Sequence, residues 1–280
     1  MAEGIAAVAT ARRQRRVSSR ACSPVVKWVG GKSKLLPDLL ARMPRTYNRY
    51  HEPFLGGGAL FFETRPAAAI LTDANAELIG CYQAIVRHVN EIILALAEHR
   101  VRHSSEYFYE TRARWNEQAR PPEHPERAAE FIYLNKTCYN GLWRVNRRGR
   151  FNVPVGRYEN PGVLDAERLQ AAAGLLARAV LRAASFESVL DEAEPGDFVY
   201  LDPPYVPLSK TASFTAYDRH PFGTEEHVRL ARVFAALGRR GVHVVLSNSD
   251  TAETRALYRG FRAEKVRVAR PINSRPSARG

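Results

Sequence analysis

The stretch DFVYLDPPY (residues 197–205) predicts both the fold class and the place of the functional site. Its first half is a short apolar run, which is typical of a buried strand that ends at the carboxylate of Asp202. In a parallel α/β sheet, ligands bind beyond the carboxyl ends of the strands. We therefore expect Asp202 and the three residues after it to face a ligand.

These four residues suit the amino group of a nucleobase. Asp202 can accept a hydrogen bond from an exocyclic amine, and Pro203, which has no N–H, offers its carbonyl as a second acceptor. Pro204 stiffens the turn, and Tyr205 supplies a face on which a flat ring can stack. Asp-Pro-Pro is also an ordinary way to end a strand and begin a loop, so the tetrapeptide alone leaves both interpretations open.

Strands and helices alternate on both sides of this stretch. Besides a strand-like run that begins at Val25, short strands are predicted at residues 50–55, 69–73, 179–183, 198–201 and 242–247. Helical patterns occupy residues 35–40, 59–64 and 225–237. Alternation of this kind argues for an α/β fold, with a parallel sheet and helices on its faces.

The middle of the chain has a different character. Long helical patterns at residues 79–97 and 126–133 are separated by polar and proline-rich stretches, and strand signals are weak there. We therefore expect three parts, which are a flexible basic arm (1–23), a core (24–75 and 174–280) and an inserted helical domain (76–173).

The net charge of +13 and the pI near 10.0 favour a polyanionic partner. The charge is uneven along the chain, because the stretch from Phe131 to Tyr158 contains no Asp or Glu. Its six basic residues are Lys136, Arg144, Arg147, Arg148, Arg150 and Arg157. We expect this stretch to form a surface that binds a phosphate backbone.

Several classes of protein are disfavoured. No apolar run approaches the length of a membrane span. The arginine cluster follows the mildly apolar start rather than preceding it, which is not the order of a secretory signal. The three cysteines (Cys22, Cys81 and Cys138) form no metal-binding spacing and suit a reducing cytoplasm. We expect no metal site and no nucleophilic cysteine.

Two glycine-rich segments indicate the kind of ligand. KWVGGKS (27–33) lacks the first glycine of a phosphate-binding loop, because Val26 stands there, so a nucleoside triphosphate site is not expected. FLGGG (54–58) is not a dinucleotide fingerprint, because position 61 is Phe61. Asp73 ends the next strand, where an acid can bind ribose hydroxyls. Loop and acid together favour an adenosine ligand without a pyrophosphate, and S-adenosylmethionine fits that description.

Six motifs carry a family resemblance. In order, they are KWVGGK (27–32), EPFLGGGALFF (52–62), DAN (73–75), NKTCYNGLWRVNRRGRFNVPVGRYENP (135–161), DPPY (202–205) and SFTAYDRHPF (213–222). The chain closely resembles the Dam-type family of DNA adenine-N6 methyltransferases over residues 25–279. The resemblance implies a Rossmann-like, S-adenosylmethionine-dependent core with a helical target-recognition insert. Members of the family usually continue beyond the segment 270–280 into a further strand, so either the chain is truncated here or the edge of its sheet is built differently.

The resemblance assigns roles to matching positions. Trp28 and Lys32 would contact the methyl donor together with the loop residues Phe54, Gly56 and Gly58. Asp73 would bind the ribose, and Asp202 would lie between the donor and the target amine.

In the insert, Tyr139 matches an aromatic residue that enters the base stack, and Asn140 and Arg144 match residues that contact the recognition sequence. Lys136, Arg147, Arg148 and Arg150 are candidates for further DNA contacts, the three arginines to phosphates. Phe214 and Tyr217 are expected in a loop that closes near the site.

The leading hypothesis is a methyltransferase that acts on a flipped adenine in duplex DNA, with GATC or a related short site as the implied target. A cytosine-N4 methyltransferase needs the same acceptors but more often carries Ser at the position of Asp202. A catalytically silent DNA-binding protein on the same scaffold would share the charge pattern. No membrane and no obligate protein partner are implied.

Overall fold

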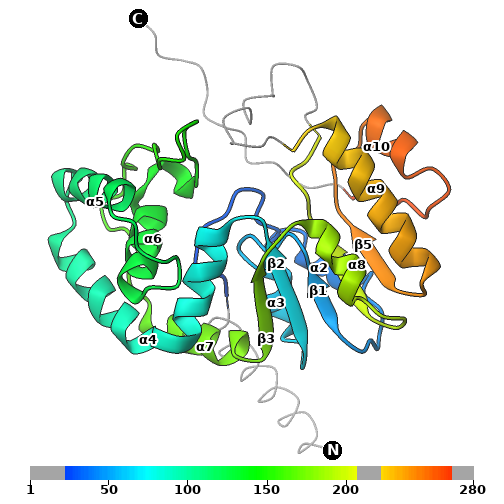
Figure 1. Ribbon diagram of the computed structural model, residues 1–280, viewed down its shortest axis with the longest axis horizontal. Coiled ribbons are helices and arrows are strands. Elements are labelled where there is room, and N and C mark those ends of the chain that lie inside the picture. Colours follow the sequence, from blue (N-terminus) through cyan, green and yellow to red (C-terminus); the bar gives the residue numbers. More distant parts are fainter. Residues whose placement is uncertain (1–22, 207–221, 267–280) are drawn as a thin grey trace, which may run out of the picture.

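A five-stranded sheet with only parallel pairings lies at the centre of the protein (Figure 1). The computed structural model describes residues 23–206 and 222–266. Within them the strand order is β3-β2-β1-β4-β5. The strands are β1 (Tyr50–Glu52), β2 (Ala69–Asp73), β3 (Ala179–Ala183), β4 (Phe198–Leu201) and β5 (His243–Leu246). This architecture confirms the expected α/β fold.

Helices cover the sheet and extend to one side of it (Figure 1). The α-helices are α2 (Leu36–Leu40), α3 (Ala59–Thr64), α4 (Ala76–Arg102), α5 (Ser105–Glu117), α6 (Pro125–Thr137), α7 (Ala166–Leu176), α8 (Val189–Glu192), α9 (Thr224–Arg239) and α10 (Ala252–Leu257). Two short 3₁₀ turns, η1 (Tyr139–Gly141) and η2 (Phe186–Ser188), complete the described elements.

All four residues of β4 are buried, because both faces of the sheet are covered. Side chains alternate between the faces of a strand. Accordingly, Phe198 and Tyr200 pack with the larger core cluster, whereas Leu201 packs with Leu230 and Leu237 of α9. This double burial explains why the strand is a continuous apolar run in the sequence.

The strand order reverses between β1 and β4, which are neighbours in the sheet but far apart in the chain. The chain leaves β1 toward the glycine loop, and it leaves β4 toward Asp202. A crevice outside the carboxyl ends of the strands at such a reversal is where open α/β sheets bind ligands.

The segment expected to be an insert is helical, with α4, α5, α6 and η1 inside it. Helix α4 also contacts the sheet, since Tyr82 Oη donates to Gly56 O (3.0 Å) and Gln83 Nε2 donates to Leu181 O (3.1 Å). Non-helical backbone angles at His88 mark a kink, after which α4 continues to Arg102. The division into core and insert remains a proposal.

Two predictions about strands were inaccurate. No strand begins at Val25, although its side chain is buried, because the backbone of Lys27, two residues further on, bonds to the side chain of Asn135 instead of to another strand. Strand β1 ends at Glu52 rather than at residue 55, since Pro53 has no N–H to continue the ladder. The basic arm up to residue 22, with Cys22, lies outside the described residues, as do Phe214, Tyr217 and residues 267–280.

None of the described helices combines the length and apolarity needed to cross a membrane. No cluster of potential metal ligands is found among the described residues. Cys81 and Cys138 are buried free thiols, and burial raises the pKa of both, that of Cys138 to about 12. Neither is therefore a thiolate near neutral pH.

Glu52 is a buried acid at the carboxyl end of β1, with a residue exposure of 3%. Tyr50 Oη donates to Glu52 Oε2 at 2.8 Å. Burial raises the pKa of Glu52 to about 8, and the nearby charges of Asp202 and Asp73 act in the same direction. The side chain is therefore mostly neutral at pH 7.

We predict that Glu52→Gln gains stability relative to the wild type as pH rises from 5 to 8. The unfolded chain releases the Glu52 proton near its ordinary pKa of 4.5, whereas the folded protein holds it to about pH 8. Between these values the unfolded state binds fewer protons than the folded state. The free energy of unfolding of the wild type therefore falls by about 1.4 kcal/mol for each unit of pKa difference. Urea unfolding of both proteins across this range measures the effect, and parallel curves would contradict it.

Candidate active site

Asp202 follows β4 directly and forms an ion pair with Lys32. The distance from Lys32 Nζ to Asp202 Oδ1 is 2.8 Å, and only 8% of the lysine side chain and 18% of the aspartate side chain are exposed. Lys32 Nζ also donates to the carbonyl of Gly30, whose positive φ of 82° turns the chain back toward the lysine. The segment 27–32 thus places the ammonium group of Lys32 at the end of β4.

A second donor reaches the same oxygen from the edge of the sheet. Ser247, which follows β5, donates through Oγ to Asp202 Oδ1 (2.9 Å) and is itself bonded to Tyr200 Oη (3.0 Å). Burial raises the pKa of Asp202, while Lys32 and Ser247 oppose that rise. Because both contacts go to Oδ1, Oδ2 is the oxygen that can face a substrate amine.

Tyr205 lies on the other side of the lysine. The centre of its ring is 4.5 Å from Lys32 Nζ, which is a cation–π distance, and 37% of the residue is exposed. Pro203 is buried and Pro204 is exposed. The tetrapeptide therefore holds a carboxylate and an accessible aromatic ring around one cation.

The glycine loop passes close to Trp28. Gly56 and Gly58 have positive φ angles of 48° and 66°, and a Cβ on Gly56 would lie 2.6 Å from Trp28 Cδ1. Asp73 ends β2 and holds the loop, since its Oδ2 accepts from Gly56 N and its Oδ1 from Asn75 N, both at 2.9 Å. Trp28, the glycine loop and Asp73 are far apart in the sequence but lie together in the structure, an arrangement that suits a ligand-binding site.

Phe54 occupies a different environment. Its ring stacks on Phe186 at 5.3 Å and meets Phe222 edge-on at 5.6 Å. The side chain therefore belongs to an aromatic cluster between the glycine loop and the segment before α9, on the α9 side of the sheet.

Three carboxyl groups gather at the ends of neighbouring strands, namely Glu52 (β1), Asp73 (β2) and Asp202 (β4), and the last two raise the pKa of the first. The close glycine backbone and the acid at the end of β2 together fit an adenosine ligand without a pyrophosphate, such as S-adenosylmethionine.

The basic stretch after α6 forms a hairpin from Arg144 to Asn152. Val145 and Phe151 form an antiparallel bridge, and the turn closes with Gly149 N donating to Asn146 O (2.8 Å). Gly149 has a φ of 74°, as the last position of such a turn requires. Arg144, Arg147, Arg148 and Arg150 are all exposed on this hairpin.

The hairpin is anchored on the helical insert through its inner face. The Trp143 ring packs against Phe131 (4.0 Å), Trp115 (5.3 Å) and Phe151 (4.6 Å). Asn116 of α5 bonds both backbone groups of Phe151, accepting from its N–H at 2.8 Å and donating to its carbonyl at 3.0 Å. The guanidinium of Arg144 is oriented by Asn152 Oδ1, which accepts from Nε at 2.9 Å.

Tyr139 and Asn140 lie in the short turn η1 that follows α6. Tyr139 is 52% exposed, and Asn140 has a left-handed φ of 54°, which is uncommon outside glycine. An exposed aromatic ring at the tip of a constrained turn suits insertion into another molecule.

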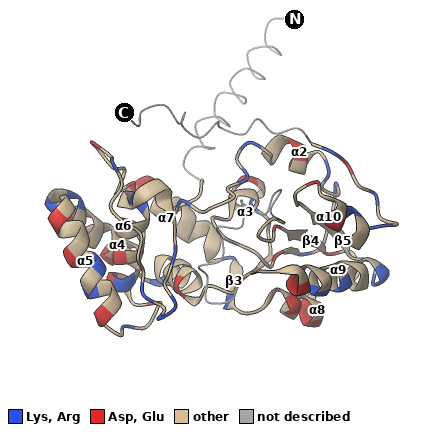
Figure 2. Ribbon diagram, turned by 90° about the horizontal axis from the view of Figure 1, so that it is seen from above, with Lys and Arg blue, Asp and Glu red and all other residues tan. Residues whose placement is uncertain are grey.

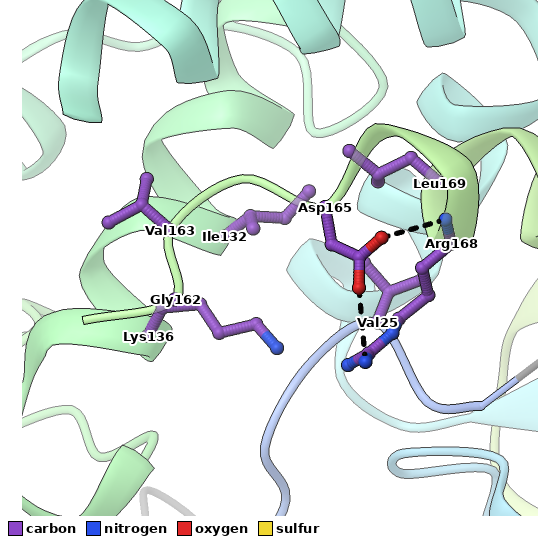
Figure 3. A pocket seen from close by; sticks show the side chains of 8 residues that line it. All are labelled: Val25, Ile132, Lys136, Gly162, Val163, Asp165, Arg168 and Leu169. Carbon is purple, nitrogen blue, oxygen red and sulfur yellow. Dashed lines mark hydrogen bonds and ion pairs between the residues drawn. The ribbon is translucent and has the colours of Figure 1, made fainter. Parts of the chain in front are cut away.

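Lys136 lines a small pocket together with residues of α6, α7, the segment before α7 and Val25 (Figure 3). Its neighbours there include Asp165 and Arg168, which pair at 3.1 Å. Burial, together with the positive charges of Arg168 and Lys27, lowers the pKa of Lys136 to about 8. The structure therefore separates Lys136 from the four exposed arginines.

Charge on the helices is mixed (Figure 2). Helix α5 carries both signs, and α8 is acidic through Asp191 and Glu192. The acid-free stretch after α6 is therefore a local feature rather than a consequence of a uniformly basic surface.

Sequence reasoning missed three residues that the structure brings to the site, which are Ser247, Glu52 and Asn135. Ser247 lay within the last predicted strand, and a polar residue at the end of a strand was a usable signal. Glu52 and Asn135 stood inside the motifs quoted above, but nothing in their spacing distinguished them from surface polar residues.

Comparison with known proteins identifies the family. A family model described as D12 class N6 adenine-specific DNA methyltransferase matches residues 28–272. The Type II methyltransferase M1.LlaDCHI of Lactococcus lactis subsp. cremoris is 41% identical over 260 residues, which cover 92% of each protein. The Type II methyltransferase M.MjaIII of Methanocaldococcus jannaschii is 37% identical over 91% of this chain and 94% of its own length.

The DNA adenine methylase of Escherichia coli (strain K12) is 38% identical over 91% of this chain and 90% of its own length. The resemblance seen in the six motifs is thereby confirmed, and with it the assignment of the chain as an enzyme. The chain belongs to the D12 class of N6 adenine-specific DNA methyltransferases.

Proposed function

We propose that this enzyme transfers the methyl group of S-adenosylmethionine to N6 of an adenine that is flipped out of duplex DNA. The observation that carries the proposal is the Asp202 carboxylate, which is mostly buried and held through Oδ1 by Lys32 and Ser247. It stands at the reversal of the sheet beside the glycine loop, where donor and target base would meet.

The chemistry requires help at the amine, because the N6 lone pair is delocalised into the adenine ring. Asp202 Oδ2 and the Pro203 carbonyl each accept a hydrogen bond from the N6 amino group. These two hydrogen bonds favour a pyramidal nitrogen with its lone pair directed at the methyl group. S-adenosylmethionine supplies a methyl carbon on a sulfonium, and transfer breaks the S–C bond as the N–C bond forms. The proton that N6 then loses passes to Asp202.

Binding of the donor and the base uses the rest of the site. Trp28, Asp73, Gly56 and Gly58 surround the donor, and Lys32 keeps Asp202 ionised within a dry surrounding. Tyr205 stacks on the base once it has left the duplex, since a paired base cannot reach such a pocket. Holding two substrates in line supplies much of the acceleration without a metal or a covalent intermediate.

DNA contacts come from the insert. Tyr139 enters the base stack, and Asn140 and Arg144 read base edges, while Arg147, Arg148 and Arg150 contact phosphates. We propose GATC or a related short site as the target, supported by the similarity to proteins named DNA adenine methylase.

Nucleoside mass spectrometry on methyl-free duplex DNA tests the reaction. After incubation with the protein and S-adenosylmethionine, we expect N6-methyldeoxyadenosine, and mapping of the modified positions gives the site. N4-methylcytosine would retain the chemistry and change the base. A folded protein that binds DNA but modifies no base would be the silent binder instead.

We predict that Asp202→Ala abolishes methyl transfer while the protein still folds and binds duplex DNA. The substitution removes the acceptor for the N6 proton, whereas the contacts of the insert remain. Asp202→Asn is the matched isosteric variant, and we expect it to be strongly impaired because one side-chain oxygen becomes a donor. Normal methylation by either variant would refute the assigned role of Asp202.

We predict that Ser247→Ala moves the acid limb of the methylation rate to higher pH. The hydrogen bond from Ser247 lowers the pKa of Asp202, so its loss raises that pKa further and protonates the carboxylate at a higher pH. Single-turnover rates across a pH series measure the midpoint. An unchanged midpoint would show that the rate does not depend on the ionisation of Asp202.

We predict that Arg144→Ala weakens discrimination between the preferred site and near-matches by about 1–3 kcal/mol, the value of a bidentate base contact. Arg147→Ala is the control on the same hairpin, and it should weaken binding to all sequences alike and reduce the salt dependence. Competition binding with duplexes that differ at one position separates the two. If both variants lose affinity equally for all duplexes, Arg144 contacts phosphate only.

A further inference from the structure

Asn135, near the end of α6, binds the main chain of a segment more than one hundred residues away. Its side chain is fully buried, with 0% exposure. Asn135 Oδ1 accepts from Lys27 N at 2.7 Å, and Asn135 Nδ2 donates to Lys27 O at 2.8 Å. One side chain thus satisfies both backbone groups of Lys27, as a neighbouring strand would.

The same amide also reaches the recognition turn. Asn135 Nδ2 donates to Gly141 O at 3.2 Å, and Gly141 closes the turn that carries Tyr139 and Asn140. Gly141 itself touches the segment, since a Cβ at this position would lie 2.5 Å from Lys27 Cδ. The exposed tip of the turn and the backbone of Lys27 are therefore held in contact through one buried group.

Lys27 immediately precedes Trp28, which lies on the glycine loop, and the segment continues to Lys32, which pairs with Asp202. The side chain of Lys27 also joins the same two regions. Its Nζ reaches the carbonyl of Lys136 at 3.4 Å and lies 4.2 Å from the centre of the Tyr158 ring. A displacement of the insert at Asn135 would therefore be transmitted to the segment that reaches Asp202.

We propose that Asn135 is a positioning residue that sets the register between the recognition turn and the methyl-transfer site. It touches neither substrate, and the inference rests on the proposed function of both regions. The turn delivers the adenine, and the segment 27–32 helps to place the donor and Asp202. A misplacement of about 1 Å between reacting groups can reduce the rate about a hundredfold, so this single clamp has a direct effect on the chemical step.

The chain contains a matched control. Asn116 forms the same two-way clamp on Phe151, but both residues of this pair lie within the proposed insert. Asn116→Ala therefore removes an equivalent pair of hydrogen bonds and loosens the hairpin, while the hydrogen bonds from Asn135 to Lys27 stay in place. Its saturated rate therefore measures what loosening the hairpin alone does to methyl transfer.

The test measures single-turnover methyl transfer with duplex DNA and S-adenosylmethionine both saturating. For Asn135→Ala we expect a rate reduced about thirtyfold to a hundredfold. Donor affinity, measured by calorimetry, and duplex affinity, measured by fluorescence anisotropy, should each stay within about threefold of the wild type. Thermal melting and the stoichiometry of donor binding correct every rate for the folded fraction.

Gly141→Ala perturbs the same contact from the side of the recognition turn. It tests the positioning role if Asn135→Ala does not fold. We expect it to slow transfer as well, because the added methyl group pushes the turn away from Lys27. The inference is overturned if the saturated rate of the folded variant lies within about threefold of that of Asn116→Ala.

The proposed function fails in a distinguishable way. If the wild type binds donor and duplex but methylates no adenine, the function is wrong and the clamp is structural. If the wild type methylates adenine and Asn135→Ala matches the control, only the positioning role is lost.

Discussion

The parallel pairing of β1 with both β2 and β4 is the constraint on which the site depends. This strand has only three residues, all buried, and it lies in the middle of the sheet. Because its neighbours run in the same direction, their carboxyl ends meet at one edge, and Glu52, Asp73 and Asp202 come together there. A break in this short ladder would separate the glycine loop from Asp202.

Burial at this edge determines the electrostatics. Grouping three acids is unfavourable unless some are neutral or paired. Here Glu52 holds its proton up to about pH 8, and Asp202 is paired with Lys32. The aromatic ring of Tyr205 shields the ammonium group from water, so the pair is stronger than an exposed one. The end of β4 therefore carries one carboxylate that is paired with an ammonium group in a largely buried surrounding.

Much of this arrangement was predictable from sequence, because strands that are buried on both faces are continuous apolar runs. Strands β2 and β4 were predicted at their observed bounds, and Asp202 was placed correctly at the end of β4. The bounds of β3 were also predicted, although this edge strand is only half-buried or exposed. The false strand at Val25 shows what a local pattern lacks: apolar residues indicate burial, but the partner of the backbone is decided by a distant side chain. The surroundings of Lys136 could not be predicted for the same reason, because its neighbours Asp165 and Arg168 come from a different helix.

The recognition hairpin is held almost entirely through its main chain and its inward-facing rings. Asn116 binds the backbone of Phe151, Asn146 and Gly149 shape the turn, and Trp143 fills the interior. The outward arginines contribute little to that scaffold. Evolution can therefore exchange the exposed side chains of Arg147, Arg148 and Arg150 without a large loss of folding stability. Under the proposed function, one framework can then acquire new sequence preferences by a few surface substitutions. A library randomised at those outward positions would accordingly be enriched in folded proteins.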